Sequence, residues 1–163
     1  MTIVTQGREC LFGEITDGEM YLNEYGEIVQ KWWNEIPIHE LGAFVIMPNH
    51  VHGIIFITTE CRGEVISPRN DPNSDIQDLY DDESNNVGGE TPPLRKPTLG
   101  QIVAYFKYQS TKEMNRIETE NAIAKFWQRN YYEHIIRDEK DLQNKTDYIE
   151  ANPSLWDEDD DNP

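Results

Sequence analysis

The stretch that decides the fold is Phe44-Val45-Ile46-Met47-Pro48-Asn49-His50-Val51-His52-Gly53-Ile54-Ile55-Phe56-Ile57. Two short runs of apolar and β-branched residues, 44–47 and 51–57, flank Pro48-Asn49, and this pattern predicts a β-hairpin. Alternate residues of a strand project to one face of the sheet, so His50 and His52 point the same way and could chelate one divalent ion. A His-x-His pair is common by chance, and taken alone it indicates two histidines on a sheet face more often than a metal site.

Helical patterns lie on both sides of this hairpin. Upstream, Asn23 can act as an N-cap, and apolar residues recur behind it at helical spacing, at Tyr25, Ile28, Val29, Trp32 and Trp33. Downstream, Thr98 and Gln101 have the spacing of a capping box. An apolar stripe follows at Leu99, Ile102, Val103 and Phe106, so a second helix is expected there.

The remaining segments complete an alternating order of elements. Residues 2–5 predict a short first strand, and residues 126–136 are aromatic and β-branched enough to predict another. Asp138 then caps a final helix that must end near Asn152, because Pro153 disfavours the helical conformation in the residue before it. The order predicts an α+β fold, a ferredoxin-like (RRM-like) sandwich whose antiparallel sheet carries helices on one face plus a C-terminal helix.

Length and composition predict one domain. A chain of 163 residues is near the usual size of a domain and buries about two-thirds of the surface that its unfolded form exposes. We expect the domain to span residues 1–155, interrupted by an acidic loop at 58–97 and followed by an acidic tail at 156–163. The loop is rich in Ser, Asn, Asp, Gly and Pro, and its length indicates disorder or, less readily, a functional flap.

Other features bear on the compartment. The sequence has neither a stretch of roughly 18 to 20 apolar residues nor the residue order of a signal peptide, which predicts a cytoplasmic protein without membrane association. Cys10 and Cys61 are too few and too widely spaced for a disulfide framework, and neither belongs to a CxxC pair. We expect both to be free thiols.

The net charge of −17 at first argues against binding to nucleic acid, which normally needs a basic patch. The charges are unevenly distributed, however: the segment 95–145 carries ten Lys and Arg against seven Asp and Glu. Much of the acidic excess lies in the loop and the tail, and such runs are usually solvated surface. The charge balance therefore does not exclude a nucleic-acid partner.

The predicted last helix carries a second chemical pair. Tyr148 and Asn152 are four residues apart and so lie on one face of a helix. A tyrosine beside a divalent metal suits phosphoryl transfer, in which the phenolate attacks and forms a covalent phosphotyrosine. From spacing alone, the simpler interpretation is a packing tyrosine and a helix-end asparagine.

The hairpin stretch resembles the signature of the HUH single-tyrosine transposases, and most closely that of their REP-associated branch. The resemblance covers nearly the whole chain except the long loop and the acidic tail. It extends through the segments Arg8-Glu9-Cys10-Leu11-Phe12-Gly13-Glu14-Ile15, Leu22-Asn23-Glu24-Tyr25-Gly26, Leu99-Gly100-Gln101-Ile102-Val103, Phe126-Trp127-Gln128-Arg129-Asn130-Tyr131-Tyr132-Glu133-His134-Ile135-Ile136-Arg137 and Asp147-Tyr148-Ile149-Glu150-Ala151-Asn152-Pro153.

The resemblance implies both a fold and a mechanism. It implies a ferredoxin-like catalytic sheet, with Mg²⁺ or Mn²⁺ held by His50 and His52 and a third ligand that maps onto Asn152. It also implies that Tyr148 nicks and rejoins single-stranded DNA near a small hairpin, through a 5′-phosphotyrosine and a free 3′-hydroxyl. A monomer is favoured over a homodimer by the same resemblance.

Several further residues are candidates for contact with DNA. Lys107, Lys112, Arg129 and Arg137 could bind backbone phosphates, although solvated surface is an equally good interpretation of each. Trp127 and Gln128 could line the site, but a tryptophan at the start of a strand is more often part of the core. The residues Tyr131 and Tyr132 match the aromatic segment of the family rather than its nucleophile, which predicts packing or base stacking.

Some features depart from the family pattern and leave two rival functions open. The connection at 36–42 is short, the chain is unusually acidic, and it stops soon after the tyrosine helix, so we expect weak and salt-dependent DNA affinity. One rival is an inactive relative that binds single-stranded DNA without cutting it. The other is a metal-dependent hydrolase without a covalent intermediate, in which the histidines activate water.

Overall fold

The computed structural model describes residues 1–38, 40–57, 97–117 and 125–158. Nearly all of the predicted loop at 58–97 and most of the predicted tail at 156–163 lie outside these residues. The elements are strands β1 (Thr2–Val4), β2 (Gly13–Thr16), β3 (Glu19–Leu22), β4 (Leu41–Ile46) and β5 (His50–Ile55), helices α1 (Glu24–Asn34), α2 (Leu99–Ile117) and α3 (Glu139–Ala151), and 3-10 helices η1 (Gln6–Arg8) and η3 (Asn152–Glu158). Within the described part of the chain, no helix is both long enough and apolar enough to cross a membrane.

The central sheet has the order β1-β5-β4, and each pair of neighbours is antiparallel. Strands β4 and β5 form the predicted hairpin around Pro48-Asn49, and β1 confirms the predicted first strand. The register places Thr2 opposite His52 and Val4 opposite His50. Since paired residues share a face of the sheet, these four side chains lie on the same side.

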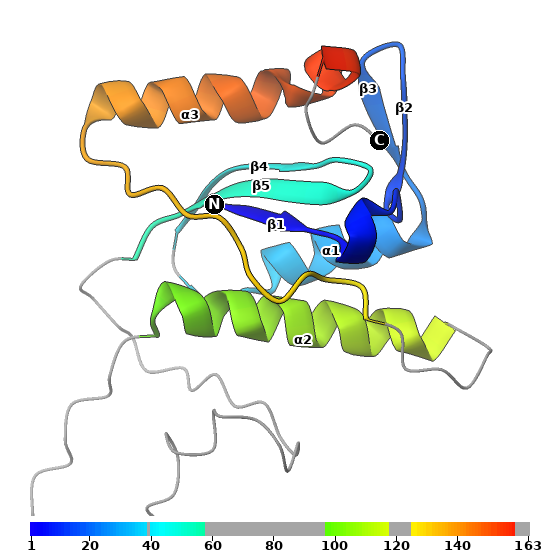
Figure 1. Cartoon of the computed structure of the whole chain (residues 1–163). Coiled ribbons are helices and arrows are strands. Elements are labelled where there is room, and N and C mark those ends of the chain that lie inside the picture. The colour runs from blue at the N-terminus through cyan, green and yellow to red at the C-terminus, as the bar shows by residue number, and fades with distance from the viewer. Residues whose placement is uncertain (39, 58–96, 118–124, 159–163) are drawn as a thin grey trace, which may run out of the picture.

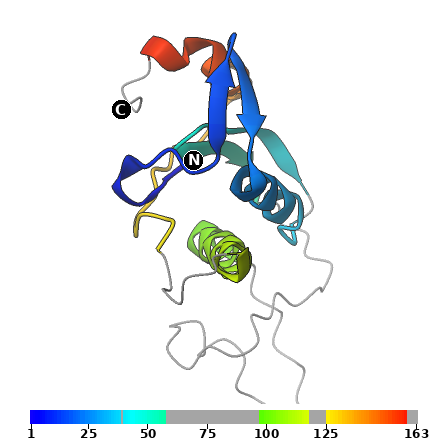
Figure 2. The same ribbon diagram turned by 90° about the vertical axis from the view of Figure 1, so that its right-hand side faces the viewer.

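Two layers of helices cover the sheet. Helices α1 and α2 lie against one face and α3 lies across the other, as Figures 1 and 2 show from perpendicular directions. The predicted α+β class is confirmed: the described residues form two small antiparallel sheets and three α-helices.

The predicted helix starts are confirmed by hydrogen bonds. Asn23 accepts a bond from the backbone N–H of Gly26, and Asp138 accepts one from that of Asp141. The capping box also forms, because the Thr98 N–H donates to the Gln101 side chain at 2.8 Å and the Gln101 N–H donates to the Thr98 hydroxyl at 3.3 Å. These side chains satisfy N–H groups that the first turn of a helix leaves unpaired.

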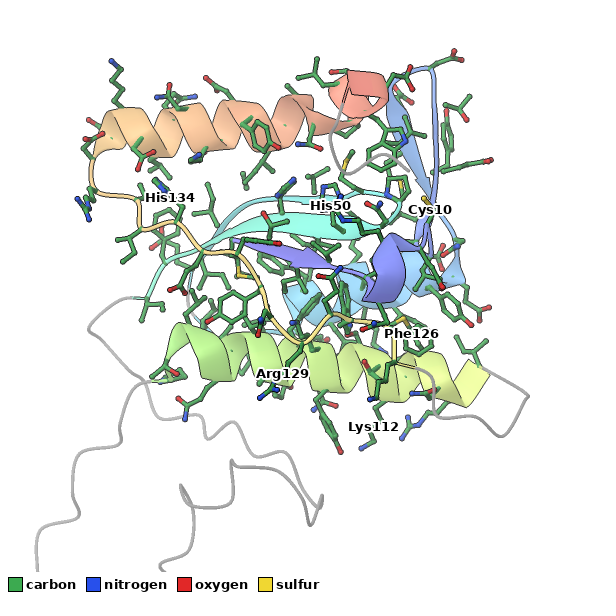
Figure 3. All side chains as sticks on the ribbon, in the orientation of Figure 1. Cys10, His50, Lys112, Phe126, Arg129 and His134 are labelled. Carbon is green, nitrogen blue, oxygen red and sulfur yellow. The ribbon has the colours of Figure 1, made fainter. Side chains whose placement is uncertain are left out.

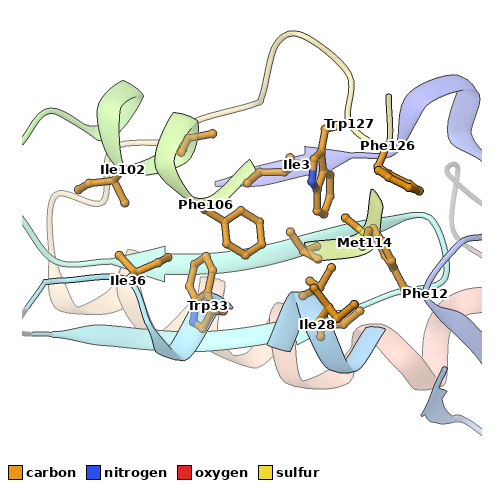
Figure 4. Close-up of a cluster of buried hydrophobic side chains, with 14 residues drawn as sticks. Ile3, Phe12, Ile28, Trp33, Ile36, Ile102, Phe106, Met114, Phe126 and Trp127 are labelled. Atoms are coloured by element: carbon orange, nitrogen blue, oxygen red, sulfur yellow. The ribbon is translucent and has the colours of Figure 1, made fainter. Parts of the chain in front are cut away.

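The hydrophobic core lies between the sheet and helices α1 and α2 (Figure 4). Trp33 stacks on Phe44 with ring centroids 4.1 Å apart, and Phe106 meets Trp33 edge-on. Trp127 packs against Phe12 and Phe106. The core therefore joins β4, both helices and the segment after residue 125.

The prediction of a regular strand at 126–136 is wrong. This segment lies beside β1 and forms only two isolated bridges, Thr5 with Trp127 and Thr2 with Tyr132. The physical reason is Lys107, whose ammonium donates to the carbonyls of residues 128, 129 and 130 at 2.8, 3.3 and 2.9 Å. These carbonyls bind a side chain instead of a neighbouring strand.

A second hairpin, β2–β3, was not expected from the sequence. Its turn is Asp17-Gly18, and both residues have positive φ, 54° and 77°. The hairpin contacts η3 at its tip, where a Cβ built on Gly18 would lie 3.4 Å from the Ser154 Cα. The hairpin thus packs against the segment that follows the C-terminal end of α3.

Helix α3 ends where expected but without the expected break. Asn152 keeps a helical conformation (φ −55°, ψ −44°) despite the following Pro153, and the chain continues as η3 to Glu158. Trp156, the first residue of the expected tail, is buried.

Candidate functional site

Two buried histidines lie at the centre of the sheet, on the face that α3 covers. His50 is fully buried and His52 is 8% exposed, and their Nε2 atoms are 3.0 Å apart. Between them, Val51 points to the opposite face and into the core. The strand alternation expected from the sequence therefore brings the two Nε2 atoms close together.

Each histidine has a partner at its other ring nitrogen. The His50 Nδ1 lies 2.8 Å from the Asn49 Oδ1, and the His52 Nδ1 lies 2.8 Å from the Thr2 hydroxyl oxygen. The Asn49 amide is held in turn, since its Nδ2 donates to the Arg8 carbonyl at 3.3 Å. Such partners fix the orientation of imidazoles that act as ligands.

Helix α3 and η3 place two aromatic side chains beside this pair. Tyr148 meets His52 edge-on with ring centroids 5.4 Å apart, and Trp156 lies 6.1 Å from His50. Asn152 follows Tyr148 by four residues and has a helical conformation, so it lies on the same helix face as Tyr148. Tyr148 is 48% exposed, whereas Asn152 is only 3% exposed.

Asn152 has an unusual environment. Its Oδ1 is buried and has no hydrogen-bond partner among the described residues. A buried polar atom without a partner normally costs about 1–3 kcal/mol, so such an atom indicates a missing ligand or a functional role. The described residues contain no cluster of three or more His, Cys, Asp and Glu suited to a metal, and a site here would thus combine two histidines with an amide.

The electrostatics keep His52 neutral. Burial, followed by the proximity of His50, the Met1 α-amino group and Lys145, lowers the pKa of His52 to about 3. Neutral imidazole is the form that binds metal ions. The Met1 ammonium donates to the Gly53 carbonyl at 2.8 Å, and burial lowers its pKa as well.

Two residues that we expected to contact DNA make structural contacts. Lys107 donates to three carbonyls, and burial lowers its pKa to about 8, so its ammonium orders the segment 128–130. Trp127 is buried in the core, and its indole N–H donates to the Ser110 hydroxyl at 3.0 Å.

The other predicted DNA contacts are spread over the molecule. Lys112 and Arg129 lie on the α2 side of the sheet, away from His50 (Figure 3). Arg137 is exposed in the segment that leads into α3, and Gln128 is half-buried, with its N–H bonded to the Val4 carbonyl. The structure thus brings His50, His52 and Tyr148 together and places Asn152 one helical turn beyond Tyr148, whereas no contact joins these four residues to the histidines within the described part of the chain.

Sequence reasoning missed four residues around the site: Thr2, Asn49, Lys145 and Trp156. Lys145 had a usable signal, because it precedes Tyr148 by three residues and so shares its helix face. Trp156 continues the spacing of four that links Tyr148 with Asn152. Thr2 and Asn49 carry no such pattern, since their contacts depend on strand pairing and on the hairpin turn.

Comparison with known proteins shows that the chain is similar to two proteins from Haemophilus influenzae. It is 38% identical over 163 residues to an uncharacterized protein, an alignment that covers 98% of this chain and 81% of the relative. The chain belongs to the family of that protein. It is also 28% identical over 159 residues, covering 93% of this chain and 67% of the relative, to a protein named "Putative REP-associated tyrosine transposase". No protein-family model matches the chain, and no solved structure matches it.

Proposed function

We propose that this protein is a metal-dependent HUH-type nuclease and strand transferase of the REP-associated tyrosine transposase kind, which nicks and rejoins single-stranded DNA through Tyr148. The observation that carries the proposal is the contact of Tyr148 with one of two convergent histidines, and the buried Asn152 oxygen one helical turn further along, which has no partner among the described residues, supports it. The sequence motifs and the similarity to the named relative agree with it.

The proposal includes a ferredoxin-like fold. The segment 126–132 bridges to β1, so the spatial order of extended segments is this segment, β1, β5 and β4. Helices α1 and α2 cover one face of this arrangement and α3 the other. The order supports a ferredoxin-like sheet in which 126–132 stands in for the edge strand.

The side chains present fit a divalent cation. Imidazole nitrogens bind divalent ions at about 2.1 Å, so two nitrogens that share one ion must lie within about 4 Å of each other. The 3.0 Å between the histidine Nε2 atoms agrees with this spacing, and Asn152 offers a neutral oxygen. His50, His52 and Asn152 would hold Mg²⁺ or Mn²⁺, which supplies Lewis-acid polarisation of the scissile phosphate.

Tyr148 is positioned to act as the nucleophile. Its ring rests against His52, which directs it to the site, and its 48% exposure leaves it open to a strand of DNA. The phenolic oxygen attacks phosphorus, the bond to the 3′ oxygen breaks, and the phenol proton passes to solvent while the departing 3′ oxygen gains a proton. The product is a 5′-phosphotyrosine, and attack by another 3′-hydroxyl on it rejoins DNA and restores the tyrosine.

Positive charge near the site suits a phosphate substrate. Lys145 and the Met1 α-amino group both lower the pKa of His52, so both lie within electrostatic range of the site. Two charges are few for a DNA-binding protein, and the net charge of −17 opposes association. We therefore expect weak binding that falls steeply with salt.

The test is a denaturing gel of the purified protein incubated with labelled single-stranded DNA hairpins, with Mn²⁺ or with a chelator. We expect a Mn²⁺-dependent covalent adduct that is lost in Tyr148→Phe and His50→Ala. The matched control is Tyr21→Phe, which alters another exposed tyrosine, on β3, and should leave the adduct intact. Cleavage without an adduct would favour a hydrolase, and binding without cleavage would favour an inactive binding module.

A further inference from the structure

The two histidines differ in how firmly their tautomers are fixed. The Asn49 amide has one defined orientation, because its Nδ2 faces the Arg8 carbonyl, which can only accept a hydrogen bond. Its Oδ1 therefore faces the His50 Nδ1 at 2.8 Å, and it too can only accept. The hydrogen of a neutral His50 must then be on Nδ1, which leaves the lone pair on Nε2.

Backbone hydrogen bonds join both Arg8 and Asn49 to Thr5. Arg8 has a positive φ of 60°, which a residue with a side chain rarely adopts. The Asn49 carbonyl accepts a bond from the Thr5 N–H at 2.8 Å, and the Arg8 N–H donates to the Thr5 carbonyl at 3.1 Å. Uncommon backbone conformations of this kind concentrate at functional sites.

His52 has a different kind of partner. Its Nε2 lies 3.0 Å from the His50 Nε2, which carries no hydrogen, so a hydrogen bond between them requires the hydrogen to be on the His52 Nε2. The His52 Nδ1 is then an acceptor, and the Thr2 hydroxyl donates to it at 2.8 Å. A hydroxyl can donate or accept by rotation, so the same contact also suits a His52 with its hydrogen on Nδ1.

We propose that Asn49 locks the tautomer of His50 while Thr2 lets His52 exchange its tautomer. Without metal, the His52 Nε2–H donates a hydrogen bond to the His50 Nε2, and this bond occupies both of the nitrogens that would bind a cation. When a cation binds, the hydrogen leaves Nε2 of His52 and appears on Nδ1 through exchange with solvent, the Thr2 hydroxyl turns to accept it, and both Nε2 lone pairs become free to act as ligands. The net proton count does not change. Asn49 and Thr2 are thus positioning residues, an assignment that rests on the proposed metal site.

The first test is a long-range ¹H–¹⁵N correlation spectrum of the imidazoles. In chelator, we expect His50 as the Nδ1–H tautomer and His52 as the Nε2–H tautomer. Added Zn²⁺, a diamagnetic probe that binds imidazole, should convert His52 to the Nδ1–H pattern and leave the tautomer of His50 unchanged. A metal-free spectrum with His52 already in the Nδ1–H form would overturn the proposal.

The second test is the affinity for Mn²⁺, measured by electron paramagnetic resonance or calorimetry. Thr2→Val keeps the shape of the side chain but leaves the Nδ1–H of metal-bound His52 without an acceptor, so Mn²⁺ affinity should fall about tenfold or more. Thr2→Ser restores the hydroxyl and should restore affinity, whereas equal affinity in Thr2→Val and wild type would refute the role of Thr2. Neither test uses DNA, so the expected spectra together with a missing DNA adduct would reject the proposed function and leave this inference standing.

Discussion

Replacing Asn152 by leucine should reverse the stability order of mutant and wild type when metal is added. Without metal, the buried Oδ1 of Asn152 has no partner among the described residues, and leucine, of similar size, removes that polar atom. An unsatisfied buried polar group costs about 1–3 kcal/mol. We therefore expect the free energy of unfolding of Asn152→Leu to exceed that of the wild type by about 1 kcal/mol, which raises the Tm by about 2–4 °C.

With metal, the order should invert. At a Mn²⁺ concentration about 100 times its dissociation constant, binding stabilises the wild type by about 2.7 kcal/mol, and a variant that lacks one ligand gains much less. The assay is urea unfolding followed by circular dichroism, in chelator and in Mn²⁺. Asn152→Asp is the control, because it keeps an oxygen ligand and should keep the response to Mn²⁺. If Asn152→Leu is the less stable protein in chelator and responds to Mn²⁺ as the wild type does, Asn152 is not a metal ligand.

Three other perturbations test the fold and its electrostatics. Gly18→Ala should cost about 1 kcal/mol in urea unfolding, because Gly18 has φ 77° and its Cβ would meet Ser154, and an unchanged midpoint would argue against the docked hairpin. Gly53→Ala should cost about 1–3 kcal/mol, because the new methyl would overlap the indole of Trp33, and a wild-type melting temperature would contradict this packing. Burial, followed by nearby positive groups, lowers the folded-state pKa of His52 to about 3 from a usual value near 6.5. As the pH falls from about 6.5 towards 3, the unfolded chain therefore binds a proton at His52 before the folded protein does, and the free energy of unfolding should decrease. In chelator, the wild type should therefore lose more stability than His52→Gln between pH 7.5 and 5, and parallel losses would show that His52 is not buried as described.

The sequence was informative about several features that local chemistry determines. The capping pair Thr98 and Gln101 forms both of its hydrogen bonds, and the turn at Pro48-Asn49 joins the two strands that carry the histidines. These features depend on residues within a few positions of one another. The alternation of His50 and His52 on a strand is equally local, which is why their convergence could be expected.

The failures arise from long-range contacts and from one overlooked turn signal. Lys107 donates hydrogen bonds to the carbonyls of residues 128–130, which lie about twenty positions away in the sequence. No pattern within that segment indicates that it would not pair as a strand. Asp17-Gly18 is a strong hairpin signal that could have predicted β2–β3. Asn152 stays helical before Pro153, a local preference that the surrounding fold overrides.

The most direct test of the central proposal is to locate the covalent bond by mass spectrometry. The protein would be incubated with a single-stranded DNA hairpin and Mn²⁺, digested with nuclease and trypsin, and searched for peptides that retain a nucleotide. The proposed mechanism requires a 5′-linked nucleotide on the peptide that contains Tyr148, present with Mn²⁺ and absent with chelator. A nucleotide on any other tyrosine, or cleaved DNA with every tyrosine unmodified, would contradict it.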